Sequence, residues 1–320
     1  MYKIGIIDTM KDKGIELLMN YKDFDCEIVT DLSRENLLLK LPEFDGITLR
    51  RGKIDRKILN KCDKLKVIAR HGVGYDSVDT ECLKEKAITL LVAHDSTSTS
   101  PAEHIMFMIM NIYKGVSMFD TMVRGGDFIK AIHLNIEKNF ELFNKIILIT
   151  GFGRIGKKLI KKCLGFDMKV LVFDPYVDDT TITSFGGAKV ATLEEGLKKA
   201  DILSLSLPLN SETKNFITLK EMKLMKKSSI IINAARGGIV NEEDLNNALD
   251  NNIIAFAGID VFEKEPPEPT NPLITNKKVV LSPHAATFTK EGLESMAVET
   301  AQNIIDFFEN KIENTKIVKL

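Results

Sequence analysis

The chain has 320 residues, of which 44% are hydrophobic and 28% are charged, and its formal net charge is −1. This length can form two domains of ordinary size, and the near-neutral charge excludes the basic surface of proteins that bind nucleic acid or an anionic membrane. The four cysteines lack CxxC spacing, and no apolar run approaches the roughly 20 residues of a membrane span. We therefore expect a cytoplasmic protein with reduced thiols, no metal site, and no nucleic-acid or membrane partner.

Residues 1–98 alternate short apolar runs with amphipathic stretches. Strands that alternate with helices predict parallel βαβ units joined by right-handed crossovers, so this segment is expected to form an α/β domain of its own. The expected strands are 3–7, 26–29, 46–49, 66–69 and 88–92, and the expected helices lie near 10–20, 33–40, 55–60 and 76–84.

A helix is predicted to start near Pro101, because proline is favoured in the first turn and hydroxyl-bearing residues precede it. Its continuation, 105–113, is apolar on nearly every face. This pattern predicts burial on all sides, as between domains or subunits. His104 is interpreted as a residue that caps this helix together with Glu103.

A dinucleotide-binding pattern occurs unusually late in the chain. An apolar run at 146–150 predicts a strand, and the helical stretch 154–164 follows it across a glycine-rich turn. The next predicted strand, 169–173, leads directly to the acidic residue Asp174. A glycine fingerprint alone is a weak indication, but here the strand, turn, helix and second strand stand in the expected order.

The three glycines of this turn have separate roles. Gly151 permits the tight turn, Gly153 lets the backbone approach a pyrophosphate, and Gly156 lets the helix pack closely on the strand. The pyrophosphate would lie at the N-terminus of the helix. Asp174 would accept hydrogen bonds from the adenosine ribose and repel a 2′-phosphate, so we predict NAD rather than NADP as the cofactor.

The second half of the chain continues the alternation of strands and helices. Thr192 and Asn241 begin capping-box-like segments, which predict helix starts. An amphipathic helix is expected at 290–310. The further strands expected in this half are 188–191, 202–207, 229–233, 254–258 and 278–281.

Three of these strands lead to side chains suited to nicotinamide chemistry. Such an enzyme needs a cation for a substrate anion, a proton donor or acceptor, and a group that controls that proton. Arg236 follows one strand, Glu265 comes shortly after the next, and His284 follows the third. Any one of them alone would more often be a surface residue. Because the carboxyl ends of parallel strands meet at the ligand-binding edge of a sheet, the three together predict an active site.

The chain resembles the D-2-hydroxyacid dehydrogenases from end to end. This resemblance implies an α/β fold of two doubly wound domains. A flavodoxin-like substrate domain, 1–98 plus 287–320, would contain an inserted Rossmann NAD-binding domain, 99–286, which explains the late glycine turn. The motifs that carry the resemblance are the Gly151 turn with Asp174, Leu207-Pro208-Leu209, Asn233-Ala-Ala-Arg236-Gly237, Asp260-Val-Phe-Glu-Lys-Glu265-Pro266 and Ser282-Pro-His284.

By this resemblance, the catalytic residues are Arg236, Glu265 and His284. Arg236 binds the substrate carboxylate and polarises the keto oxygen. His284 is the general acid in ketone reduction and the general base in alcohol oxidation, while Glu265 hydrogen-bonds the imidazole and favours its protonated form. Asp260 contacts the nicotinamide carboxamide or ribose. The cofactor-binding residues implied are Gly151, Gly153, Arg154, Ile155, Gly156, Asp174, Leu207, Pro208, Thr213, Ala234, Ala235 and Asp260.

The segment that starts at Arg70 resembles the substrate loop of the family, with Ser77 where an asparagine is usual. Free amides around Gly72, Val73 and Gly74 are expected to bind the substrate carboxylate as a nest. The substrate-binding residues implied are therefore Gly72, Val73 and Gly74, together with Arg50, Arg236 and His284.

The basic run Arg50-Arg51-Gly52-Lys53 matches the region where related enzymes contact the distal part of the substrate. Three cations there suit a phosphate or a second carboxylate. A solvated basic loop without a substrate role is an equal alternative. The run is the one indication of substrate identity in the sequence.

Several activities within the family remain open. Glu265 argues against the formate-oxidising branch, which lacks this glutamate, and Ala285-Ala-Thr-Phe288 matches the D-lactate branch poorly. We expect reversible, NAD-dependent conversion of a small 2-keto acid, of the 3-phosphoglycerate, hydroxypyruvate or glyoxylate type. A D-lactate or other D-2-hydroxyacid dehydrogenase is the alternative within the family. An NAD-sensing, corepressor-like binding protein is the alternative from another class.

The resemblance also bears on assembly. Relatives dimerise through the cofactor domain, so a homodimer is expected. Because the sequence stops at Leu320, we expect no regulatory domain of the kind that long phosphoglycerate dehydrogenases append. The expected ligand partner is a small 2-keto or 2-hydroxy acid.

Overall fold

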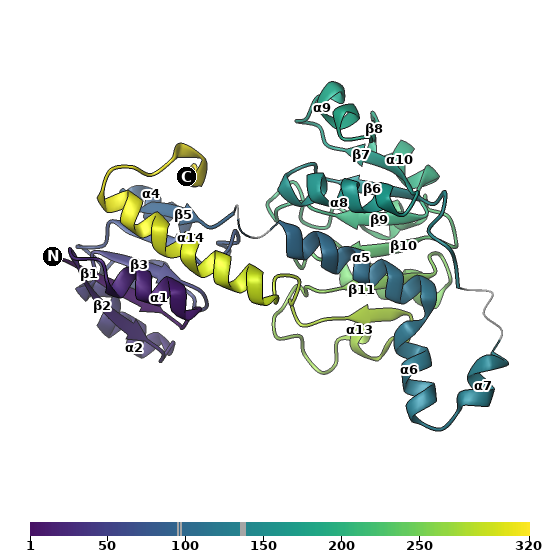
Figure 1. Ribbon diagram of the computed structural model, residues 1–320, viewed down its shortest axis with the longest axis horizontal. Coiled ribbons are helices and arrows are strands. Elements are labelled where there is room, and N and C mark those ends of the chain that lie inside the picture. The colour runs from purple at the N-terminus through teal and green to yellow at the C-terminus, as the bar shows by residue number, and fades with distance from the viewer. Residues whose placement is uncertain (95, 97, 135–138) are drawn as a thin grey trace. The chain divides into compact units, whose positions relative to one another are not determined.

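The computed structural model describes residues 1–94, 96, 98–134 and 139–320. The chain divides into two compact units, each with one parallel sheet flanked by helices (Figure 1). Unit 1 comprises Met1–Ser98 and Phe288–Leu320, and unit 2 comprises Thr99–Thr287. Both ends of the chain belong to unit 1, so unit 2 is an insertion within it. This architecture confirms the predicted fold class.

Unit 1 has a five-stranded parallel sheet in the order β2-β1-β3-β4-β5. This is the flavodoxin-like order, in which ligands bind at the carboxyl ends of β1 and β3, where the strand order reverses. Short runs rich in isoleucine, leucine and valine form these strands, as expected for a sheet covered on both faces. The strands are β1 Tyr2–Ile7, β2 Phe24–Val29, β3 Gly46–Leu49, β4 Val67–Arg70 and β5 Thr89–Val92.

Helices cover both faces of the unit 1 sheet, and each face has its own hydrophobic core. On one face, α2, α3 and α4 pack through leucines and isoleucines, and on the other, α1 packs beside α14. The C-terminal helix thus completes a domain that the N-terminus began. The helices are α1 Asp12–Met19, α2 Arg34–Lys40, α3 Arg56–Leu59, α4 Thr80–Glu85 and α14 Lys290–Phe308, with 3-10 turns η1 Leu41–Glu43 and η2 Asn314–Lys316.

Unit 2 has a seven-stranded parallel sheet in the order β12-β11-β10-β9-β6-β7-β8. Read from β8, this is the Rossmann order with one additional strand, and the strand order reverses between β6 and β9. Asn233 pairs with Ile259, and Ile259 with Leu281, so three neighbouring strands end at the same level. The strands are β6 Ile146–Thr150, β7 Lys169–Phe173, β8 Ala188–Lys189, β9 Ile202–Leu205, β10 Ile230–Asn233, β11 Phe256–Ile259 and β12 Val279–Leu281.

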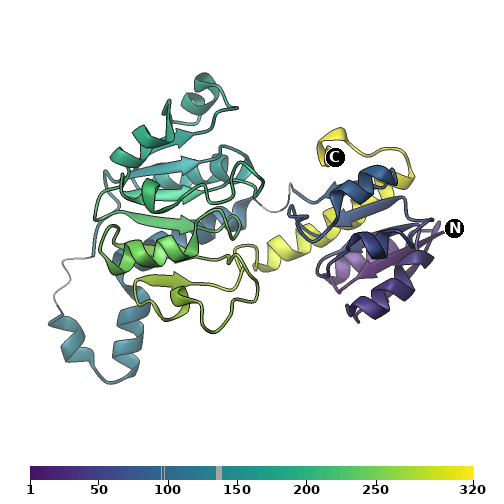
Figure 2. The same cartoon turned by 180° about the vertical axis from the view of Figure 1, so that it is seen from behind.

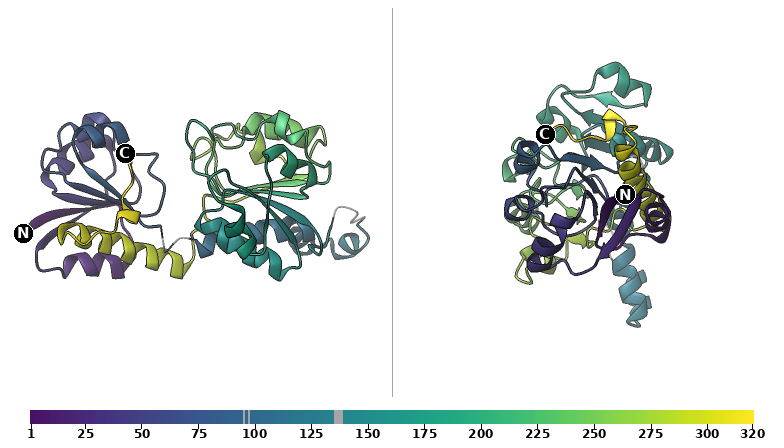
Figure 3. Two further views of the ribbon diagram at one scale, coloured as in Figure 1. Left: turned by 90° about the horizontal axis from the view of Figure 1, so that it is seen from above. Right: turned by 90° about the vertical axis from the view of Figure 1, so that its left-hand side faces the viewer.

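Helices lie on both faces of this sheet (Figure 3), and each face has its own hydrophobic core. Helices α5 and α8 cover one face, and α10, α11 and α12 cover the other, where α12 is drawn in green in Figure 2. The bounds are α5 Thr99–Lys114, α6 Val116–Arg124, α7 Phe128–Ile132, α8 Arg154–Gly165, α9 Asp179–Ser184, α10 Leu193–Lys199, α11 Leu219–Met222, α12 Glu242–Asp250 and α13 Pro272–Thr275.

The side chains of Thr192 and Asn241 cap α10 and α12, as their sequence patterns predicted. The hydroxyl of Thr192 accepts a hydrogen bond from the Glu195 amide at 3.2 Å, and the Asn241 amide oxygen accepts one from the Asp244 amide at 2.9 Å. Such bonds satisfy amides that the first turn of a helix leaves unpaired.

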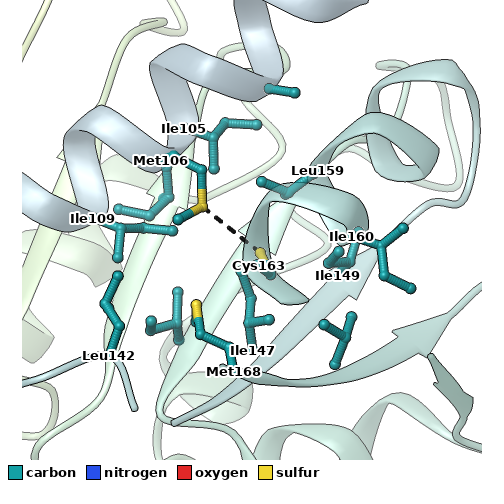
Figure 4. Close-up of a cluster of buried hydrophobic side chains, with 14 of the residues drawn as sticks. Ile105, Met106, Ile109, Leu142, Ile147, Ile149, Leu159, Ile160, Cys163 and Met168 are labelled. Carbon is teal, nitrogen blue, oxygen red and sulfur yellow. Dashed lines mark hydrogen bonds between the residues drawn. The ribbon is translucent and has the colours of Figure 1, made fainter. Parts of the chain in front are cut away.

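Helix α5 packs its apolar side chains against α8 and the sheet (Figure 4). Met106 and Cys163 face each other at the centre of this contact, with their sulfur atoms 3.7 Å apart. Phe107 of this helix is 58% exposed, so one chain alone does not bury the helix on every side, and burial against a partner subunit stays a prediction. None of the helices in the described part of the chain is long and apolar enough to cross a membrane.

Helices α6 and α7 extend away from the sheet of unit 2 (Figure 1). The described residues of α6 include none that is buried, although the helix has an apolar side. Exposed apolar side chains are frequent here: Val116, Met118, Val123, Phe128, Ile129 and Ile132. We call these six residues the apolar arm. The sequence patterns did not predict these two helices.

Candidate active site

The three predicted catalytic side chains lie at the same edge of the unit 2 sheet. Arg236 follows β10, Glu265 lies in the loop after β11, and His284 follows β12. Since these strands are neighbours and end in register, the loops that leave them share one edge. This arrangement follows from the rule that the carboxyl ends of parallel strands form the ligand-binding edge.

His284 and Glu265 are in direct contact. Nδ1 of His284 lies 2.7 Å from Oε2 of Glu265, and the other carboxylate oxygen accepts the Phe262 amide at 3.0 Å. Burial by itself raises the pKa of Glu265, but the hydrogen bond and charge of His284, the Phe262 amide and the charge of Arg236 together hold that pKa below 4.5. The carboxylate is therefore ionised at neutral pH and fixes the orientation of the imidazole.

This contact determines which ring nitrogen can serve a substrate. An ionised carboxylate can only accept hydrogen bonds, so Nδ1 of His284 carries a proton and donates a hydrogen bond to Glu265. The opposite nitrogen, Nε2, takes no part in this contact. The side chain of His284 is 48% exposed, so a ligand can reach it.

Arg236 lies next to this pair and is half-buried. Its Nη1 donates to the carbonyl oxygen of Ala235 at 2.6 Å, which holds the side chain against its own loop. Its charge also contributes to the lowered pKa of Glu265. A fixed guanidinium beside an imidazole can bind a carboxylate while the imidazole exchanges a proton.

Asp260 organises the backbone that carries His284. The backbone oxygen of Asp260 accepts the His284 amide at 2.7 Å. Its carboxylate oxygens accept the Ala285 amide at 2.8 Å and the Ala286 amide at 3.1 Å. Asp260 has no exposed surface. The predicted contact of Asp260 with the nicotinamide stays a prediction, whereas its observed contacts are those of a residue that holds a turn.

Two further side chains surround the Asp260 carboxylate. The Ser282 hydroxyl lies 2.5 Å from Oδ1, and Nε2 of His104 lies 2.9 Å from the Ser282 hydroxyl and 3.4 Å from the same carboxylate oxygen. Burial by itself raises the pKa of Asp260, but the hydrogen bonds from His104, Ser282 and Ala285 outweigh it and lower the pKa to about 2. The interpretation of His104 as a helix cap was wrong, because α5 begins at Thr99 and places His104 beyond its first turn.

The glycine turn after β6 has the geometry of a pyrophosphate site. Gly151 has φ +87°, and a side chain there would meet the Ser206 carbonyl at 2.5 Å. A Cβ on Gly156 would lie 2.6 Å from the carbonyl oxygen of Gly151, so helix and turn pack without a side chain between them. At Gly153, which caps α8, a Cβ would meet no described atom within 4 Å. The turn therefore leaves space at a helix N-terminus for an anion.

Asp174 is closely joined to this turn. Its carboxylate accepts the Phe152 amide at 2.7 Å and the Tyr176 amide at 2.9 Å. Each carboxylate oxygen has a second lone pair, so these bonds leave acceptor capacity for ribose hydroxyls. An acid fixed at the end of β7 fits the predicted NAD site, and the bonds add a role in the shape of the turn that the sequence did not indicate.

The other predicted cofactor residues lie along the same edge of the sheet. Leu207 and Pro208 follow β9, and Ala234 and Ala235 follow β10. Thr213 holds the loop after β9, because its hydroxyl donates to the Pro208 carbonyl at 2.6 Å. Arg154 is exposed in the first turn of α8, and Ile155 beside it is half-buried. All of them lie at the edge of the sheet formed by the carboxyl ends of the strands, where a Rossmann fold binds its dinucleotide.

In unit 1, the predicted substrate loop follows β4. The expectation of a free amide is wrong for Gly72, whose N–H donates to the Arg70 carbonyl at 3.0 Å because the backbone turns back at φ +124°. Within the described part of the chain, the amides of Val73 and Gly74 make no hydrogen bond. The side chain of Arg70 donates to the Gly74 carbonyl at 2.7 Å and holds the loop. Of the three amides expected to be available for an anion, those of Val73 and Gly74 therefore remain.

Arg51 is paired with an acid that the sequence analysis did not single out. Its Nε lies 2.6 Å from Oδ2 of Asp8, and a second nitrogen lies 3.1 Å from Oδ1. Arg50 lies farther from this carboxylate, at 3.8 Å, and donates to the Thr9 carbonyl at 3.2 Å. Asp8 and Arg50 follow β1 and β3, the strands between which unit 1 would bind a ligand. The position of Asp8 directly after the first expected strand was the sequence signal that could have identified this acid.

His71 lies beside these charges and is buried. Burial, and then the charge of Arg50, lowers the pKa of His71 to about 4, so the ring is neutral at physiological pH. Among the described residues, nothing hydrogen-bonds to its Nε2. A neutral, buried ring is typical of a side chain that packs against its neighbours.

Comparison with known proteins agrees with this geometry. Residues 106–286 match the family model described as D-isomer specific 2-hydroxyacid dehydrogenase, NAD binding domain. The chain belongs to the D-isomer specific 2-hydroxyacid dehydrogenase family. Its unit 2 is accordingly a NAD-binding domain, with the glycine turn and Asp174 inside the matched segment.

Relatives within this family are similar over nearly the whole chain. A D-3-phosphoglycerate dehydrogenase of Methanocaldococcus jannaschii is 34% identical over 95% of the chain, and a glyoxylate reductase of Aeropyrum pernix is 34% identical over 96%. The solved structure of a protein from Thermus thermophilus has a TM-score of 0.88 at 26% identity, covering 99% of this chain and 100% of that one.

These relatives differ in length. The chain spans 57% of the Methanocaldococcus jannaschii dehydrogenase but 94% of the Aeropyrum pernix reductase. It spans 50% to 54% of three further phosphoglycerate dehydrogenases, from Arabidopsis thaliana and Archaeoglobus fulgidus. Similarity to the longer dehydrogenases therefore concerns about half of each of them.

Proposed function

We propose that the protein is a NAD-dependent D-2-hydroxyacid dehydrogenase that reversibly reduces a small 2-keto acid. The 2.7 Å contact between His284 and Glu265, beside Arg236 at one edge of the NAD-binding domain, carries this proposal. It unites an anion-binding cation, a proton-exchanging group and a carboxylate that controls it. Those are the protein groups that hydride transfer to a keto acid requires.

Each residue has a definite task in the proposed reaction. Arg236 binds the substrate carboxylate through two parallel hydrogen bonds and brings the keto group beside His284. When bound, NADH supplies the hydride that adds to the keto carbon. His284 gives the proton on Nε2 to the oxygen, which becomes the hydroxyl, and Glu265 stabilises the imidazole while it is charged. In the oxidation direction, Nε2 takes the proton back.

The cofactor contacts are also a proposal. The amides at the start of α8, with Arg154 and Ile155, would hold the pyrophosphate, and Asp174 would bind the adenosine ribose. Leu207, Pro208 and Thr213 would line the site after β9. Ala234, Ala235 and Asp260 would lie toward the nicotinamide. The open space over Gly153 and the remaining acceptor capacity of Asp174 support this assignment.

Unit 1 is proposed to act as the substrate domain. The unpaired amides of Val73 and Gly74 suit a carboxylate oxygen, with Gly72 shaping the loop. Arg50 is the better candidate for the distal end of the substrate, because Arg51 is already committed to Asp8. The net positive charge left in this loop suits an anionic group.

The relatives guide the substrate class. Proteins of similar sequence carry the names D-3-phosphoglycerate dehydrogenase and glyoxylate reductase. We therefore propose a substrate of the 3-phosphoglycerate, hydroxypyruvate or glyoxylate type. The reductases resemble the chain over nearly their full length. Among these substrates, this favours a short keto acid such as glyoxylate.

A homodimer is proposed on the basis of the apolar arm. Phe128, Ile129 and Ile132 are 56%, 66% and 62% exposed, and exposed apolar patches commonly mark interfaces. A second copy of this chain is the proposed occupant. Light scattering of the protein and of Ile129→Asp tests this: a dimer that becomes a monomer supports it, and an unaltered mass contradicts it.

A cytoplasmic location is proposed as well. Cys62, Cys82 and Cys163 are buried free thiols, which are usual in a reducing compartment. Fractionation of the source cells would test the location, and recovery outside the cytoplasm would contradict it.

A panel of 2-keto acids tests the proposed activity. The loss of NADH absorbance is followed with glyoxylate, hydroxypyruvate, a phosphorylated 2-keto acid and pyruvate. Turnover of at least one, to a product of D configuration, is expected. If NADH binds but no member of the panel is reduced, the enzyme assignment fails and a cofactor-sensing binding protein becomes the better account.

A further inference from the structure

The backbone at His284 is held in a conformation that a histidine rarely adopts. Its φ is +52°, in the left-handed region that residues with a side chain adopt uncommonly and at a cost in free energy. This backbone conformation sets the direction of the Cα–Cβ bond of His284 and therefore the direction of its imidazole. Other residues must stabilise the turn in this conformation.

One residue captures the successive amides of this turn. Asp260 accepts the amide of His284 on its backbone oxygen, and those of Ala285 and Ala286 on its two carboxylate oxygens. For all these bonds to form, the Asp260 side chain must keep one rotamer. The orientation of His284 therefore depends on how well the position of the Asp260 carboxylate is fixed.

The proton positions around this carboxylate can be assigned. Asp260 is ionised and can only accept, so the Ser282 hydroxyl, 2.5 Å away, uses its single O–H to donate a hydrogen bond to Oδ1. That hydroxyl can then only accept from Nε2 of His104, at 2.9 Å. Nε2 of His104 therefore carries a proton. The chain of donors runs from His104 through Ser282 to Asp260.

Secondary structure brings these residues together within unit 2. Asp260 and Ser282 directly follow β11 and β12, whose last residues, Ile259 and Leu281, are paired. Helix α5 packs on both strands and places His104 over the point where they end. The His104 side chain is only 17% exposed, so its ring is confined.

We propose that His104 and Ser282 are positioning residues for the proton-exchanging His284, acting through Asp260. They fix the carboxylate that fixes the backbone of the turn, without themselves contacting the substrate. This inference rests on the proposed role of His284. It assigns a function to a histidine on the long helix that precedes the dinucleotide turn.

Substitutions at position 104 test this proposal. In His104→Ala the donor is lost, and kcat for keto-acid reduction should fall about 10-fold, since small misplacements of a reacting group are costly. KM and the NADH dissociation constant should change by less than about 3-fold, because neither ligand touches His104. His104→Gln places an amide N–H near the position of Nε2 and should restore kcat to within about 3-fold of the native value. Glu103→Gln, on the same turn of α5, is the control; it removes only an exposed ion pair with Lys162.

A second measurement does not depend on activity. Amide hydrogen exchange of the segment 284–286 is compared in the native protein, His104→Ala and His104→Gln, with thermal unfolding to verify that each is folded. Exchange should be faster in the alanine variant and near native in the glutamine variant. If no keto acid is reduced, the proposed function fails, but the exchange rates still decide whether His104 holds the turn. Native exchange and native kcat in His104→Ala, or equal loss in both variants, would overturn the proposal.

Discussion

Nδ1 of His284 lies 2.7 Å from Oε2 of Glu265, although the two residues follow different strands. The contact gives the imidazole one orientation and directs Nε2 away from Glu265. Because the pKa of Glu265 is held below 4.5, chiefly by His284 against the opposing effect of burial, the carboxylate keeps its charge at neutral pH.

Glu265→Gln should lower kcat for keto-acid reduction by at least about 10-fold, because the neutral amide stabilises a charged imidazole less well. The advantage of the native protein should be lost as the pH falls through the lowered pKa of Glu265, below 4.5, where the native carboxylate takes up a proton. Steady-state rates across pH measure this. Glu263→Gln, an exposed acid in the same loop, is the control, and equal rates in native protein and Glu265→Gln would contradict the assignment.

Asp174→Asn should relax the discrimination against NADPH. The substitution removes the negative charge that would repel a 2′-phosphate, while its amide oxygen can keep one of the bonds to the Phe152 and Tyr176 amides. We expect the ratio of kcat/KM for NADPH over NADH to rise about 10-fold, which corresponds to roughly 1.4 kcal/mol. Asp167→Asn is an exposed control with the same change of charge. An unaltered ratio would show that another group selects the cofactor.

Arg50→Gln should reduce kcat/KM for a phosphorylated 2-keto acid by about 10-fold and for glyoxylate by less than about 3-fold, if Arg50 pairs with the phosphate. The comparison uses both substrates with the same enzyme preparation. Arg56→Gln is the control, since Arg56 is paired with Glu85 at 2.6 Å. Equal losses on the two substrates would favour a solvated basic loop.

Arg51→Gln should destabilise the protein by about 1 kcal/mol, a modest value because Arg51 is 68% exposed and solvent screens its pair with Asp8. Burial by itself raises the pKa of Asp8, but Arg51 and the Thr9 amide lower it below 3.8. The stabilisation is therefore present above about pH 4 and is lost as the pH falls through the lowered pKa. Urea unfolding at neutral pH and near pH 3 measures the difference, with Lys53→Gln as control. A difference that grows toward low pH would contradict this account.

The sequence predicted the strands well because their signal is local. The run Gly46–Leu49 is a strand at the expected residues, and the run at 146–150 likewise. Continuous apolar runs between turns identify buried parallel strands without knowledge of their partners. Helix α6 was missed because Gly115 at its N-cap offers no capping side chain and because its apolar side faces away from the core.

The sequence could predict the site residues that directly follow strands. It could not predict which side chains these residues contact. Arg236, Glu265 and His284 could be predicted to lie near one another, because parallel strands bring their carboxyl ends to one edge of the sheet. The contact of His104 with Ser282 joins residues from distant parts of the chain, so no local pattern reports it. The bond from Gly72 to Arg70 depends on a backbone angle of +124°, which a glycine permits but does not require.

The most direct test of the central claim is the effect of His284→Gln on NADH-dependent keto-acid reduction. Single-turnover rates are measured at saturating NADH, with NADH affinity determined separately and His133→Gln as an exposed control. Loss of the general acid should lower the rate by at least about 10²-fold and leave the NADH dissociation constant nearly unaltered. An undiminished rate in His284→Gln would remove His284 from the mechanism and contradict the proposed active site.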